Sequence, residues 1–112
     1  MIKGIDRDQL NNIIIFYEPS LAIGSDKAAP LEHTRIILAA LRDAITKEYG
    51  SDIVKRQLFM YGGGANLESV RAIMELEDIN GIGMGKAGLN FEFFTEAIKL
   101  AVELESKLFL KK

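Results

Sequence analysis

The sequence predicts a parallel α/β fold built from three strand-then-helix units. Apolar, β-branched runs alternate with longer segments whose apolar residues recur at helical spacing, and glycine or proline separates the two. The predicted strands cover about 12–17, 57–61 and 79–84, and the predicted helices about 30–48, 66–76 and 90–108. Because the strands are predicted to run parallel, their C-terminal ends should all meet at one edge of the sheet, and the crossovers between them should be right-handed.

The first unit begins with the continuous apolar run Ile13-Ile14-Ile15-Phe16, which is typical of a strand buried on both faces. Pro30 suits a helix start, since the N–H that it lacks has no partner there. Gly50 is placed to stop that helix.

Glycine and asparagine mark the element boundaries of the second and third units. Gly62-Gly63-Gly64 ends the second strand, and Asn66 is a good N-cap for the helix that follows. The third strand leads into Gly85-Lys86-Ala87-Gly88, after which Asn90 can cap the last helix. The loops after the three strands are therefore expected to be the functional ones, and those near Gly50 and Glu77 only to connect.

Composition excludes several classes of function. The 112 residues fit one domain, and 14 Lys and Arg against 16 Asp and Glu give no reason to expect nucleic acid or an anionic membrane as partner. With no Cys and one His, disulfides and thiolate or multi-histidine metal sites are excluded, and no metal or cofactor is expected. No apolar run is long enough to span a bilayer and the N-terminus lacks a signal-peptide pattern, so a cytoplasmic location is expected.

Three parallel strands also leave two open sheet edges. We expect another part of the same protein, or another copy of this chain, to cover them.

Glu18 is the candidate catalytic residue. It lies at the C-terminal end of the first strand, and a loop of small residues from Pro19 to Lys27 follows directly. A general base must be near the reacting atom and shielded from bulk water, and a strand end beneath a lid offers that setting. The alternative is that Glu18 is an exposed carboxylate at the end of a strand with no catalytic role.

Two glycine-rich turns, 62–64 and 85–88, each follow a strand and precede a helix. Backbone N–H groups approach an anion closely where side chains are absent, so the pair suggests a phosphate site. The alternative is that glycine simply permits tight turns. Residues 83–88 also match G-x-G-x-x-G, but no strand follows the helix, so a dinucleotide site is disfavoured. His33, in the first helix, is expected to be solvated.

The motif Tyr17-Glu18-Pro19, followed by Ala22-Ile23-Gly24 and Lys27, resembles the YEPxxAIGxxK signature of the triosephosphate isomerase family. Tyr61-Gly62-Gly63 resembles the start of that family's YGGS turn, and Asn80-Gly81 with Gly85 and Ala87 its last phosphate turn. The likeness runs from about Ile5 to Ser106. It implies that residues 1–112 are a single C-terminal part of a TIM (β/α)8-barrel domain, holding its last three βα units.

The resemblance also implies roles. Glu18 becomes the base that moves a proton between two carbons of a triose phosphate through an enediolate, in glycolysis and gluconeogenesis. The lid is the segment from Pro19 to Ala29, and Tyr61 helps to latch it near Ala29. The lid and latch residues are Pro19, Ala22, Ile23, Lys27 and Tyr61, and the phosphate-binding residues are Gly24, Gly63, Gly64, Gly85 and Lys86.

The chain departs from the family at Leu21, Gly64 and Lys86, where the family has Trp, Ser and Gly. It also has no counterpart to the family's electrophilic Lys and His, so the isolated chain is expected to be nearly inactive. A homo-oligomer or a complementing N-terminal barrel half is the expected partner. The alternative function is a divergent, non-catalytic phosphate-binding half-barrel or scaffold protein.

Overall fold

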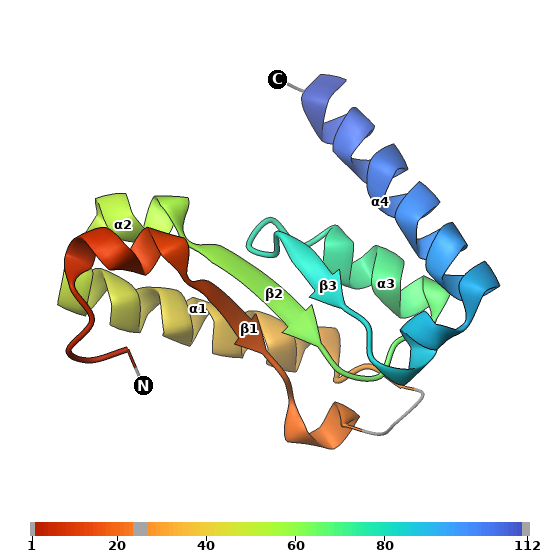
Figure 1. Cartoon of the computed structure of the whole chain (residues 1–112), viewed down its shortest axis with the longest axis horizontal. Coiled ribbons are helices and arrows are strands. Elements are labelled where there is room, and N and C mark those ends of the chain that lie inside the picture. Colours follow the sequence, from red (N-terminus) through yellow and green to blue (C-terminus); the bar gives the residue numbers. More distant parts are fainter. Residues whose placement is uncertain (1, 24–26, 111–112) are drawn as a thin grey trace.

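The computed structural model describes residues 2–23 and 27–110, and its sheet has three parallel strands in the order β1-β2-β3 (Figure 1). The strands are β1 (Ile14–Tyr17), β2 (Leu58–Gly62) and β3 (Gly81–Gly83). Tyr17 lies opposite Tyr61, and Gly62 lies opposite Gly83. The predicted parallel α/β architecture is therefore confirmed, with the strand C-terminal ends at one edge.

The helices are α1 (Leu31–Tyr49), α2 (Ser51–Arg56), α3 (Leu67–Met74) and α4 (Phe91–Leu110). The described residues also form the short 3-10 helices η1 (Arg7–Asn12), η2 (Ser20–Ala22) and η3 (Lys86–Leu89). None of the helices in the described ranges has the length and apolarity needed to cross a membrane.

The predicted helix boundaries have the expected local causes. Gly50, with φ of 94°, ends α1. Asn66 caps α3 through a reciprocal pair of hydrogen bonds with Ser69, at 2.8 and 2.9 Å. The Asn90 side chain accepts a 2.9 Å bond from the Phe93 N–H.

Other boundaries differ from the prediction. Asn12 belongs to η1, not to the first strand. The segment after Gly50, predicted only to connect, forms α2 because Ile53 is buried in the core. β3 starts only at Gly81, since the Asn80 side chain, not its carbonyl, accepts the 2.8 Å bond from the Phe59 N–H.

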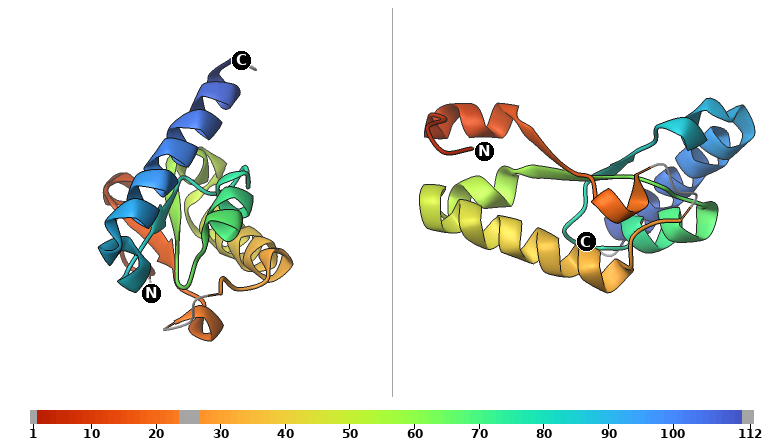
Figure 2. Two further views of the ribbon diagram at one scale, coloured as in Figure 1. Left: turned by 90° about the vertical axis from the view of Figure 1, so that its right-hand side faces the viewer. Right: turned by 90° about the horizontal axis from the view of Figure 1, so that it is seen from below.

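One face of the sheet carries the core. Figure 2 shows α1 and α3 on the same side of the sheet, and side chains from both pack against every second strand residue. The buried members include Ile15, Phe59 and Tyr61 of the strands, Leu38 and Ile45 of α1, and Ile73 of α3. A second cluster joins α3 to α4 through Val70, Ala97, Leu100 and Leu104.

The opposite face of the sheet is open in the part of the chain that the structure describes. Ile14, Phe16 and Leu58 on that face are 53%, 49% and 46% exposed. The prediction that β1 is buried on both faces is therefore wrong within this chain. Because exposed apolar area of this kind is unfavourable in water, the open face indicates an unfilled contact.

Arg42 of α1 ties several elements together at the N-terminal ends of the strands. Its guanidinium lies 4.1 Å from the ring centre of Phe59 and donates a 2.8 Å hydrogen bond to the Asp78 carbonyl. It also pairs with the Asp78 carboxylate at 3.0 Å. The edge opposite to the predicted site is thus cross-linked by one side chain.

Candidate active site

The candidate site lies where the three strands end. Glu18 follows β1, the turn 63–66 follows β2, and the segment 84–90 follows β3 (Figure 1). Because the strands are parallel and in register, these three segments share one edge of the sheet. Glu18 is exposed, and strand alternation assigns it to the same open face as Ile14 and Phe16.

The loop after Glu18 is partly buried. Pro19 and Ala22 are buried, and η2 shapes the segment between them. Leu21 and Ile23 project outward, at 75% and 59% exposure. Gly24, a predicted phosphate residue, lies outside the described residues, while Lys27 is exposed where the description resumes.

Two hydrogen bonds fasten this loop to the end of β2. The buried Ala29 N–H donates to the Tyr61 hydroxyl at 3.0 Å, and the Gly64 N–H donates to the Ala22 carbonyl at 2.8 Å. Tyr61 is itself fully buried. Both stems of the loop are thereby held against the turn after β2, which is the arrangement that a lid and its latch need.

Gly63 must be glycine for two independent reasons. Its φ of 136° is a conformation that side chains rarely adopt, and a Cβ there would lie 2.9 Å from the Ala22 Cβ. The Gly64 N–H is already donated to Ala22, so it can bind phosphate only when the loop releases it. A Cβ at Gly85 would meet open space, and Lys86 next to it is exposed.

Tyr17 adds an aromatic contact beneath the loop. Its ring meets that of Tyr61 edge to face, with centres 6.4 Å apart. Burial, and secondly the neighbouring Tyr61, raises the pKa of Tyr17 above its ordinary value. Both effects favour the neutral phenol.

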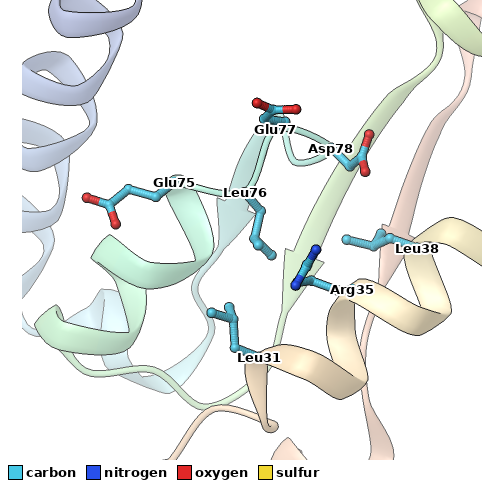
Figure 3. Close-up of a pocket in the computed structure, with 7 residues that line it drawn as sticks. All are labelled: Leu31, Arg35, Leu38, Glu75, Leu76, Glu77 and Asp78. Carbon is cyan, nitrogen blue, oxygen red and sulfur yellow. The ribbon is translucent and has the colours of Figure 1, made fainter.

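Two hollows lined by described residues lie near these elements, and Glu18 lines neither of them. One of about 280 Å³ lies between the second stem of the loop and the start of α3. Another, of about 320 Å³, lies between α1 and the connection from α3 to β3 (Figure 3). Leu31, Leu38 and Leu76 point into it, and its Arg35 pairs with Glu32 at 3.2 Å. Glu18 is exposed at the strand ends, next to the unfilled face of the sheet.

No group of three or more His, Asp and Glu that could hold a metal ion occurs among the residues that the structure describes. The sequence prediction overlooked two residues, Phe16 and Arg42. Phe16 and Glu18 are two residues apart, so strand alternation puts both on the same face of the sheet. This signal was available in the sequence. Nothing in the sequence points to the Arg42 contacts, because they join α1, β2 and the connection before β3, which are far apart along the chain.

Together, the fold and these loops define a β/α-barrel type of unit, with its candidate chemistry at the C-terminal ends of the strands. The family model described as triosephosphate isomerase matches residues 1–101. The chain therefore belongs to the triosephosphate isomerase family.

Individual relatives agree with this assignment. The chain is 31% identical to a triosephosphate isomerase of Saccharopolyspora erythraea, over 89% of this chain and 38% of that protein. It is 35% identical to that of Onion yellows phytoplasma, over 99% of this chain and 42% of that protein. It is 36% identical to that of Buchnera aphidicola, over 91% of this chain and 40% of that protein. The chain thus spans about two fifths of the length of these relatives.

Tyr61→Phe is expected to destabilise the fold by about 1–2 kcal/mol, because the buried Ala29 N–H loses its acceptor. Amide hydrogen exchange at Ala29 should speed up while exchange in α3 stays slow. Urea unfolding with residue-resolved exchange measures both. Tyr17→Phe, which removes a hydroxyl from the same aromatic pair, serves as the control. Equal exchange at Ala29 in the two variants would contradict the latch role of Tyr61.

Proposed function

We propose that this chain supplies the base, lid and phosphate-binding loops of a triosephosphate isomerase. The reaction interconverts dihydroxyacetone phosphate and glyceraldehyde 3-phosphate, and it belongs to glycolysis and gluconeogenesis in the cytoplasm. The observation that carries the proposal is the pair of hydrogen bonds, Ala29 to Tyr61 and Gly64 to Ala22, that fastens the loop beginning at Glu18 to the neighbouring turn.

In this proposal the Glu18 carboxylate removes a proton from one substrate carbon and returns it to the next, through an enediolate. The loop from Pro19 to Ala29 closes over the substrate and excludes water, so that the enediolate does not leak protons or lose its phosphate. Backbone amides of the two glycine turns that are not engaged within the protein, with the Lys86 ammonium, hold the phosphate dianion. The reaction needs no metal and no organic cofactor.

The carbonyl-polarising groups are proposed to come from the rest of the barrel. The histidine of this chain, His33, is exposed on the first turn of α1, and α1 covers the sheet face opposite to the open one (Figure 2). Losing one preorganised electrostatic group typically costs about 10²- to 10³-fold in turnover. The 112 residues by themselves are therefore expected to be nearly inactive, and an N-terminal barrel part is the proposed occupant of the open sheet face.

Complementation tests the proposed function. The chain is produced together with the part of the Buchnera aphidicola triosephosphate isomerase that it does not match, and isomerase turnover is measured in a coupled assay. We expect turnover from the pair and only background from either piece alone. A folded, stoichiometric pair without turnover would overturn the proposal. Sedimentation of the chain alone shows whether copies of it pair instead.

A second function, a phosphate-binding scaffold without catalysis, is favoured by one observation. Lys86 is exposed in the last turn, so its ammonium group can bind an anion there without catalysing a reaction. This alternative predicts that the complemented pair binds inorganic phosphate but does not turn over a triose phosphate. It also predicts that Lys86→Gly weakens phosphate binding.

A further inference from the structure

The open face of the sheet carries an aromatic ring next to the candidate site. Phe16 precedes Glu18 by two residues on β1 and is half exposed. Its backbone pairs with that of Met60 on β2. Its ring lies against two glycines nearer to the strand ends, Gly62 and Gly83.

The fit between the ring and these glycines is tight. A Cβ on Gly62 would lie 2.0 Å from the Phe16 Cε1 atom, and a Cβ on Gly83 would lie 2.3 Å from its Cζ atom. A side chain at either position would force the Phe16 ring to move. Neither glycine is among the described glycines with positive φ, so backbone conformation does not require glycine at either position. The Phe16 ring occupies the space that a side chain at either position would need.

This arrangement puts the ring across three strands. Gly62 and Gly83 are register partners on β2 and β3, and Phe16 reaches both from β1. Gly62 leads directly into the turn 62–64, and Gly83 leads into the turn 85–88. The ring therefore lies beneath the segments that are proposed to hold phosphate, and on the same sheet face as the Glu18 position.

We propose that Phe16 is the floor of the substrate site and limits the length of the ligand. The inference rests on the proposed function, which places the phosphate at the glycine turns and the reacting carbons at Glu18. A ligand held that way has the Phe16 ring below it, so additional carbons cannot extend along the open face toward the N-terminal ends of the strands. The site then accepts a three-carbon phosphate ester and rejects longer ones by steric exclusion.

Ligands of two lengths test the floor. Glycerol 3-phosphate and ribitol 5-phosphate are titrated into the 112-residue chain and its Phe16→Ala variant, and the ratio of the two dissociation constants is measured. We expect the substitution to shift this ratio in favour of the five-carbon ester by about tenfold or more. Ile14→Ala, which removes an apolar side chain from the same face two residues farther from the strand ends, should leave the ratio unchanged.

The possible results separate this inference from the proposed function. Binding of both esters with an unchanged ratio in Phe16→Ala overturns the floor and leaves the phosphate site standing. Absence of binding of either ester to the unaltered chain overturns the phosphate site of the proposed function, and the floor with it.

A ligand-free measurement checks the packing on its own. In the native chain the Hα protons of Gly62 and Gly83 should be shifted upfield by the ring, and Phe16→Leu should abolish that shift. Gly83→Ala should lower the unfolding midpoint in the native background but not in the Phe16→Ala background, because the ring is the group that the new methyl meets. Normal Hα shifts, or equal effects in both backgrounds, would overturn the floor even where the esters bind.

Discussion

Glu18→Gln is expected to lower the isomerase turnover of the complemented pair by about 10²- to 10⁴-fold. Glutamine keeps the size and hydrogen-bonding shape of the side chain but cannot accept the substrate proton. The loop bonds between Ala29 and Tyr61 and between Gly64 and Ala22 do not involve the carboxylate, so folding and phosphate binding should persist.

Glu18→Asp sharpens the same test. Aspartate keeps the charge but withdraws the carboxylate by one methylene, and a displacement of about 1 Å at the reacting centre can cost about 10²-fold. Glu32→Gln is the matched control, since Glu32 is an exposed carboxylate paired with Arg35 on the first turn of α1. Turnover that survives Glu18→Gln, or falls equally in Glu32→Gln, contradicts the assignment of Glu18 as the base.

Phe59→Ala is expected to destabilise the chain by about 3–5 kcal/mol. Phe59 is on the central strand and fully buried, and its ring carries the Arg42 guanidinium at 4.1 Å, so truncation leaves a cavity and removes a cation–π contact. The free energy of unfolding of a folded domain is about 5–15 kcal/mol in total. Because this sheet has one uncovered face, we expect the chain to be at the low end of that range. The variant alone should therefore be largely unfolded.

Urea unfolding followed by circular dichroism measures that loss. Leu58→Ala is the matched control, because Leu58 precedes Phe59 on the same strand but is 46% exposed on the open face. Its cost should stay below about 1 kcal/mol. Similar losses in the two variants would mean that the helix-covered face does not hold the principal core.

The part of the fold that the sequence predicts is the part that depends on local signals. Gly50, Asn66 and Asn90 end or cap helices through their own side chains or backbone, so neighbouring residues were enough to find them. The helix α2 escaped prediction because its formation depends on burial of Ile53 against distant elements. β3 is shorter than predicted because Asn80 replaces a backbone acceptor with its side chain.

The candidate site was predictable to a similar degree. The order of strands and glycine turns indicated that Glu18 and both turns share one sheet edge, and the parallel register confirms that placement of the strand ends. The bond between the Gly64 N–H and Ala22 was not predictable, since backbone partners across a loop leave no mark on residue type. Strand alternation could have indicated that Phe16 lies on the same sheet face as Glu18. It could not have indicated that the Phe16 ring extends from β1 to glycines of both β2 and β3.

The Arg42 cross-link has a consequence for how substitutions act. It joins α1, β2 and the connection before β3 at the edge opposite to Glu18, so this contact does not depend on the loops of the candidate site. Substitutions at exposed loop positions such as Leu21 and Lys86 can therefore alter ligand binding while the cross-link stays intact.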